Sequence, residues 1–193
     1  MKPWTNLLLL ALLAGCATRP EPHIYILGTA TEPAAGVRDN TARKVIELKP
    51  VLIPDHLDTT DILLRTGTNE LKASETGIWG ERLSVGITQA LAGALARRIP
   101  SALVVARPPA ARPALQILVD ITALQSRTGG DCVLTAHWTI LRPSDDAGTS
   151  QTLASAQGNF TTHGDGPSDG AVVAAITSAI DQLADQIARG VRS

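Results

Sequence analysis

Alternation of apolar and polar residues predicts an antiparallel sheet in the second half of the chain. One segment carries an apolar residue at every second position, the period of a strand with one buried face: Leu115, Ile117, Val119 and Ile121. A Gly129-Gly130 turn follows it. We predict a return strand over 133–141 and a third strand over 151–161, so that the three strands form a meander.

Shorter apolar runs predict further strands in the first half. These runs lie at 24–27, 45–53 and 102–106. In the second run we expect Ile46 and Leu48 to face one side, with Glu47 and Lys49 on the other side.

A β-hairpin is expected between these runs. Segments 61–65 and 70–73 flank Thr66-Gly67-Thr68-Asn69, and Gly67 and Asn69 suit a turn that needs positive φ.

Two amphipathic helices are predicted from apolar residues that recur every three or four positions. The first should run from Trp79 to Ile99, because Pro100 cannot continue a helix. The second should begin at the N-cap Ser168 and stop near Gly190. We expect both helices to pack on one face of a mixed, largely antiparallel sheet, which gives a two-layer α+β fold.

The N-terminal segment has the pattern of an exported lipoprotein. Lys2 precedes an apolar run from Leu7 to Leu13, which is shorter than the roughly 20 residues that span a bilayer. Leu13-Ala14-Gly15-Cys16 then resembles the lipobox of bacterial lipoproteins, in which a peptidase cuts before a lipid-modified cysteine. The alternative is an ordinary buried cysteine after an apolar run.

This pattern divides the chain into three parts. We predict a signal peptide over 1–15, a tether over 16–23 and a single periplasmic domain over 24–193. Cys16 would be the lipid attachment site and would carry acyl chains such as palmitate, which anchor the protein in a membrane. Ala17 stands where an Asp would resemble an inner-membrane retention signal, so we expect the periplasmic face of the outer membrane.

Composition excludes some classes of protein. Hydrophobic residues make up 44% of the chain and charged residues 18%, which is typical of a globular domain. Removal of residues 1–15 takes away only one charged side chain, Lys2, so 16 basic residues face 18 acidic ones. Such a balance gives no basic surface for a nucleic acid. Cys132 is then the remaining cysteine and is expected in a buried strand, without a disulfide.

No catalytic or metal-binding constellation is predicted. Gly166-Pro167-Ser168-Asp169-Gly170 fits a nucleophile-elbow pattern, but the last histidine, His163, precedes Ser168, so the usual order of the triad is not met. Asp145-Asp146 is interpreted as a solvated turn. The histidines have no metal-ligand spacing, and we expect neither a metal nor another cofactor. A lipid-anchored domain of this kind is more typical of a binding or structural partner than of an enzyme.

Short motifs in the mature chain carry a family resemblance. They are Tyr25-Ile26-Leu27, the stretch from Val51 to Asp58 and the segment from Trp79 to Leu83, joined by Ile62–Arg65 and Asn69-Glu70-Leu71. These segments resemble the PqiC-type auxiliary lipoproteins of ABC-type and MCE-type envelope transport systems. The chain departs from that family at His56, where an aromatic residue is usual, and at Gly80, where alanine is usual.

The resemblance implies a function in lipid transport. It implies a non-enzymatic outer-membrane lipoprotein that docks onto an MCE-type periplasmic tunnel protein and supports membrane integrity. A homo-oligomeric ring of copies would suit the symmetry of such a tunnel, although the sequence itself does not show one. The residues expected to contact this partner lie in the first apolar run, the loop after Ile53 and the hairpin: Tyr25, Leu27, Pro54, Asp55, Leu57 and Arg65. The alternative is an independent envelope-assembly lipoprotein, of the lipopolysaccharide-assembly plug or secretion pilotin type.

Overall fold

The structure is a computed structural model, and it describes residues 21–28, 43–144 and 149–192. The predicted signal peptide, Cys16, the first part of the tether and Asp145-Asp146 lie outside these residues. The elements follow in this order: β1 (His23–Tyr25), β2 (Lys44–Leu48), η2 (Asp55–Leu57), β3 (Asp61–Gly67), β4 (Glu70–Trp79), α2 (Leu83–Arg98), β5 (Ala102–Val105), β6 (Leu115–Ser126), β7 (Asp131–Pro143), β8 (Ser150–His163) and α3 (Asp169–Arg192).

The larger sheet contains the predicted meander. It has five strands in the order β5-β2-β6-β7-β8, in which β6, β7 and β8 are antiparallel neighbours and β2 runs parallel to β5 and to β6. The period-two pattern is confirmed, because Ile117, Val119 and Ile121 are buried on β6. Gly130 turns the chain between β6 and β7 with a φ of 84°.

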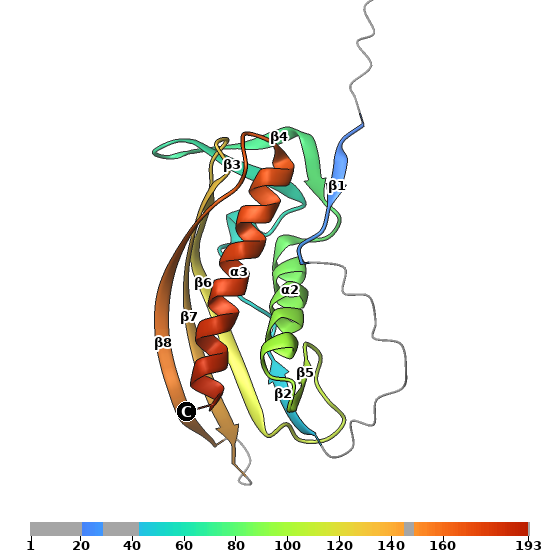
Figure 1. Cartoon of the computed structure of the whole chain (residues 1–193), viewed down its shortest axis with the longest axis vertical. Coiled ribbons are helices and arrows are strands. Elements are labelled where there is room, and N and C mark those ends of the chain that lie inside the picture. The colour runs from blue at the N-terminus through green and yellow to red at the C-terminus, as the bar shows by residue number, and fades with distance from the viewer. Residues whose placement is uncertain (1–20, 29–42, 145–148, 193) are drawn as a thin grey trace, which may run out of the picture.

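The predicted hairpin belongs to a second, smaller sheet. Its strand order is β1-β4-β3, with β3 antiparallel and β1 parallel to β4. The hairpin is therefore confirmed, but its turn differs from the prediction: neither Gly67 nor Asn69 has a positive φ. In Figure 1 this sheet caps one end of the molecule, where α3 begins.

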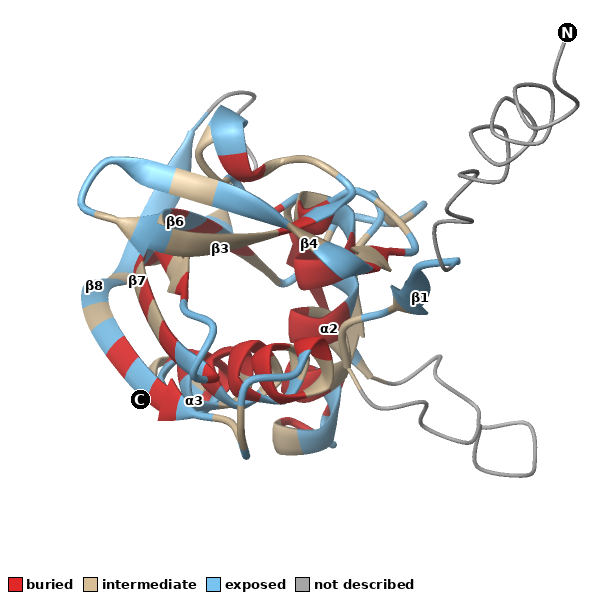
Figure 2. Ribbon diagram, turned by 90° about the horizontal axis from the view of Figure 1, so that it is seen from above, coloured by how far each residue is buried: buried red, intermediate tan, exposed pale blue. Residues whose placement is uncertain are grey.

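The two helices lie side by side against the larger sheet (Figure 1). Their inward residues and the inner face of the meander form the core, and Figure 2 shows buried positions on both helices and on strands of the larger sheet. Fully buried members of this core include Ile87, Leu91, Leu95, Ile117, Ile121, Leu134, Ile140, Ile180, Leu183 and Ile187. The α+β class and the mixed sheet are confirmed. Neither helix is both long enough and apolar enough to cross a bilayer.

Several predicted boundaries were wrong. Trp79 ends β4 and does not begin a helix, because its backbone pairs with β1 and its N–H donates to Thr60 O at 2.7 Å. Gly190 lies within α3, which continues to Arg192. The run 45–53 is a strand only as far as Leu48, although Leu52 forms an isolated bridge with Asp120.

Candidate functional site

β1 is an edge strand with one exposed isoleucine on it and a second directly after it. Ile24 is 70% exposed and Ile26 is 60% exposed, and both lie on the segment that enters the domain. Gly80 N donates to Tyr25 O at 2.8 Å, which fixes the end of β1 beside the end of β4. A Cβ at Gly80 would approach the Cγ2 atoms of both isoleucines to 3.2 Å, so glycine allows this close fit.

The chain crosses helix α2 directly after β1. A Cβ added at Gly86 would lie 3.7 Å from Leu27 Cδ1, and one added at Gly28 would lie 3.4 Å from Ala90 Cβ. Gly28 has a φ of 83°, a conformation that other residues rarely adopt. The small residues of α2 therefore admit this crossing segment.

The loop around η2 holds the first turn of α2. Leu57 is buried, whereas Asp55 is exposed. Asp58 Oδ1 accepts a hydrogen bond from Ser84 N at 3.1 Å, and its Oδ2 forms an ion pair with Arg82. Partial burial opposes ionisation of Asp58, but the hydrogen bonds from Ser84 and Arg82 outweigh it and lower its pKa.

Five of the six predicted contact residues lie near one junction. Tyr25 pairs with Trp79 at the end of β4, and Leu83 N donates to Thr59 O, just after the 54–58 loop, at 3.2 Å. Residues 24–27 and 54–58 thus flank the segment that joins β4 to α2. We call this set of residues the β4–α2 junction.

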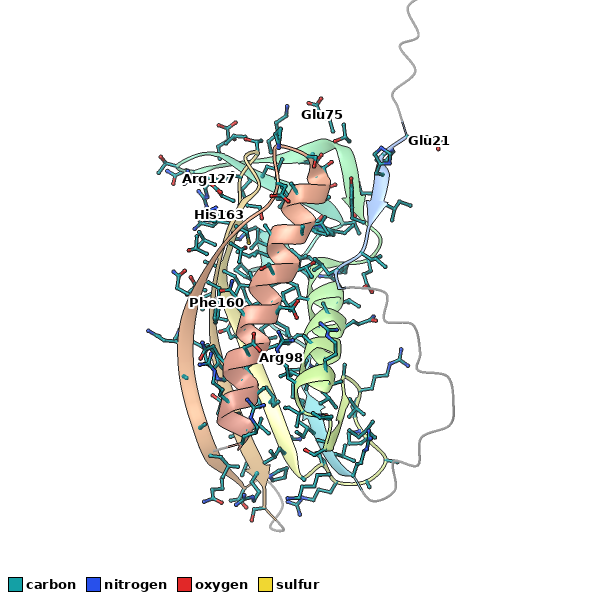
Figure 3. The ribbon with its side chains drawn as sticks, in the orientation of Figure 1. Glu21, Glu75, Arg98, Arg127, Phe160 and His163 are labelled. Atoms are coloured by element: carbon teal, nitrogen blue, oxygen red, sulfur yellow. The ribbon has the colours of Figure 1, made fainter. Side chains whose placement is uncertain are left out.

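Arg65 lies apart from this junction. Its Nη1 donates to Thr68 O at 2.6 Å and to Gly67 O at 3.3 Å, so its guanidinium supports the hairpin turn. It lines a cavity of about 570 Å³ together with Gln125 and Arg127. Figure 3 shows Arg127 at the same end of the molecule as Glu75.

A buried carboxylate that the sequence did not indicate lies behind Tyr25. Asp169, only 8% exposed at the start of α3, accepts hydrogen bonds from Thr76 Oγ1 at 2.6 Å and Ser74 Oγ at 2.8 Å. A Cβ at Gly77 would lie 2.6 Å from Asp169 Oδ2 and 2.8 Å from Tyr25 Cε2. Gly77 therefore lets β1, β4 and α3 come into contact. A glycine inside a strand often marks such a close approach, and this was the one sequence signal for the contact.

The candidate reactive groups are held in structural roles. Ser168 caps α3, since its Oγ accepts from Ala171 N at 3.2 Å. Cys132 is fully buried, and burial raises the pKa of its thiol to about 11, so it is not a nucleophile at neutral pH. Within the described residues, no three His, Cys, Asp or Glu side chains are grouped so that they could hold a metal ion.

The fold and the junction define a two-layer α+β domain whose first strand lies at an exposed edge. The family model for ABC-type transport auxiliary lipoprotein components matches residues 25–188. The chain therefore belongs to that family.

Comparison with solved structures supports the same fold. A crystal structure of an uncharacterized protein is 17% identical, covers 89% of this chain and 99% of its own, and has a TM-score of 0.66. Protein XCC0632 from Xanthomonas campestris is 15% identical, covers 86% of this chain and 90% of its own, and has a TM-score of 0.60. At these identities the similarities show the fold alone. A search of curated proteins gave no match.

Proposed function

We propose that this protein is a non-enzymatic outer-membrane lipoprotein subunit of an MCE/ABC-type envelope lipid-transport system. Cys16 would carry the acyl anchor, and the β4–α2 junction would dock onto a periplasm-spanning tunnel protein. The observation that carries the proposal is the exposure of Ile24 on the edge strand β1 and of Ile26 directly after it, within a chain of the transport auxiliary family. Exposed apolar residues at a sheet edge are a surface that a partner can cover.

The position of β1 supports docking close to the membrane. A fully extended chain spans at most about 3.6 Å per residue, so the residues between Cys16 and His23 can separate an anchor from β1 by only about 25 Å. Partner contact at β1 would therefore take place near the membrane to which Cys16 is attached. The 54–58 loop belongs to the same junction and extends this surface.

Site-specific photocrosslinking in intact cells tests the docking. A photoreactive residue at Ile24 or Ile26 is expected to crosslink to an MCE-domain protein. The same probe at Leu118, which is exposed on the larger sheet, should not do so. Crosslinks from Ile24 to a secretin or to a lipopolysaccharide-assembly barrel would contradict the proposal and favour an envelope-assembly role.

The anchor is tested separately. Mass spectrometry of the mature protein should show a diacylglyceryl modification on Cys16, and Cys16→Ser should release the protein from the membrane fraction. An unmodified thiol at Cys16 would contradict the proposed anchoring, whatever partner β1 contacts.

A further inference from the structure

Strand β8 forms a long edge on the side of the molecule away from β1 (Figure 1). It has 14 residues and pairs with β7 along its length. Among the described residues, no strand pairs with its other side. One register shift interrupts the ladder near Leu153 and leaves a continuous ladder from Ala154 to His163. Its outward backbone groups are therefore available for a further strand.

This edge lacks the residues that usually prevent strand addition. Natural edge strands are short, bulged, or carry lysine, other charges or proline. β8 contains no Lys, Arg, Asp, Glu or Pro. The described edges of the two sheets other than β8 offer a shorter or less regular ladder: β1 has three residues, β5 has four, and β3 carries Asp61, Arg65 and two register shifts.

The core-facing side of β8 is lined by small residues. Ala154, Ala156 and Gly158 alternate on this face, and Ala156 is exposed although it lies opposite the buried Trp138. Phe160 is the large apolar residue of the row and is 6% exposed, because its ring lies over Gly158. In Figure 3 the Phe160 label lies between β8 and α3. Phe160 already covers Gly158, whereas the methyl groups of Ala154 and Ala156 cover little of the neighbouring part of the row.

We propose that β8 is a strand-addition site for an extended, uncharged segment of a partner protein. The alternate residues of this segment would be bulky and apolar and would cover Ala154 and Ala156, as cross-strand pairing of large with small residues favours. A neutral edge offers no ion pair to a charged segment. The site does not involve β1 or Cys16, so it stands independently of the docking proposed above.

A second copy of this chain fits the edge less well. On the core-facing row its β8 would bring one large apolar residue, Phe160, which is already buried against its own strand. Pairing of two such edges would therefore place small residues against small ones and leave the inner row uncovered. A different protein can supply the missing side chains.

Hydrogen exchange of the full chain in detergent tests the proposal. The probe is a synthetic peptide of alternating valine and threonine with blocked ends, and its control carries a central proline. We expect the alternating peptide to slow amide exchange within 150–163 at least tenfold, and the proline peptide to have no effect. Ala156→Lys should abolish the slowing, because an inward charge blocks the edge. Leu118→Lys, on a strand with partners on both sides, should retain it.

Each other outcome overturns the proposal. No slowing with either peptide would mean that the edge accepts no strand. Equal slowing of amide exchange in wild type and Ala156→Lys would show that the peptide does not bind along the β8 edge. Protection that rises with protein concentration without peptide and is lost in Ala156→Lys would identify a second copy as the occupant. If Ala156→Lys does not fold, Gln157→Lys, an exposed position on the outer row of β8, replaces it.

Discussion

Glu47 shows how a single charged residue is stabilised inside the domain. It is 3% exposed, and its carboxylate accepts hydrogen bonds from Lys49 Nζ at 2.7 Å and Gln116 Nε2 at 2.8 Å. Burial alone would raise the pKa of Glu47, but these two hydrogen bonds outweigh it and lower the pKa. The folded structure therefore stabilises the ionised carboxylate, and its loss removes the acceptor of Lys49 Nζ and Gln116 Nε2, both of which are partly exposed.

Glu47→Gln should lower the free energy of unfolding by about 1.5–3 kcal/mol at neutral pH, the range for hydrogen bonds to charged groups. Because the folded state lowers the pKa, the stabilisation exists above the ordinary glutamate pKa of about 4.3 and is lost as pH falls below it. Urea unfolding at several pH values measures this. Glu70→Gln, on an exposed residue, is the control. An equal loss at pH 7 and pH 3 would contradict the assignment.

Gly77 determines the local structure because it has no side chain. Gly77→Ala should cost about 1–3 kcal/mol, because its Cβ would overlap Asp169 and Tyr25. Gly129→Ala is the matched control, since a Cβ there meets nothing within 4 Å. Denaturant unfolding gives the stabilities, and hydrogen exchange at β1 should accelerate only in Gly77→Ala. Equal effects of the two substitutions would show that the contact is unimportant.

The sequence pattern predicts the elements on which Glu47 and Asp169 lie, but it does not show that their side chains are buried. Glu47 lies on the expected polar face of its strand, yet it is buried because Gln116 and Lys49 satisfy its carboxylate. Asp169 was expected near the start of a helix, but its hydrogen bonds come from Ser74 and Thr76, more than 90 residues earlier. Burial of a polar side chain depends on such distant partners, and hydrophobic periodicity does not contain that information.

At the scale of elements, α2 is capped by a residue far from it in sequence. Arg82, at the N-cap position, makes no side-chain cap, and Asp58 supplies the acceptor for Ser84 N from 26 positions away. An anion at a helix N-terminus also interacts favourably with the helix dipole. The 54–58 loop is therefore connected energetically to the helix that it precedes.

Asp58→Ala should destabilise the protein by about 0.5–2 kcal/mol, as expected for a lost N-cap. Asp58→Asn keeps an acceptor and should lose less. Asp55→Ala, on an exposed residue of the same loop, should change little. The pKa of Asp58 is lowered on folding, so the cost of Asp58→Ala should shrink as pH falls below about 4. Urea unfolding at pH 7 and pH 3 distinguishes this cap from a pH-independent packing effect.

The elements were predicted well where the apolar pattern repeats over many residues. The meander strands and both helices were found because their patterns continue over many residues. The start of α2 was misplaced by four residues, since Trp79 and Leu83 share a helical spacing although Trp79 belongs to β4. The choice between strand and helix at Trp79 depends on its pairing with Tyr25, which local sequence does not show.

At the scale of the whole molecule, ion pairs join the two helices. Arg98 Nε donates to Asp185 Oδ1 at 2.6 Å and Arg98 Nη1 to Asp181 Oδ1 at 3.0 Å. Arg97 Nη2 reaches Asp181 at 3.1 Å. Figure 3 labels Arg98 between α2 and α3. The pattern of the α2 segment alone does not indicate these ion pairs, because the acids lie on the other helix.

The division into two sheets was also not predicted. The strands were expected to form one sheet, but β1, β3 and β4 pair with one another and not with β2 or β6. The pairing depends on which strands the helices cover and which edges remain free, and these are properties of the assembled molecule. The pairing of β1 with β4 also places Tyr25 and Leu27 near the 54–58 loop, whereas Arg65 lies at the turn of the hairpin.

The interhelical ion pairs should make a small, salt-dependent contribution to the stability of the whole domain. Arg98 has a side chain that is 21% exposed, whereas Asp185 is 54% exposed, so solvent screening limits their coupling. A double-mutant cycle of Arg98→Gln with Asp185→Asn should give a coupling of up to about 1 kcal/mol, which decreases in 1 M salt.

The pair of Arg97 with Asp181 provides the comparison for this cycle. Arg97 is 43% exposed and makes one bond, so its cycle should give a smaller coupling. Arg98 also lowers the pKa of Asp185, and its contribution should therefore disappear as pH falls through the normal range of aspartate. Equal couplings for the two arginines, or a coupling for Arg98 that salt and acid leave unchanged, would show that the helices are held together by their apolar faces alone.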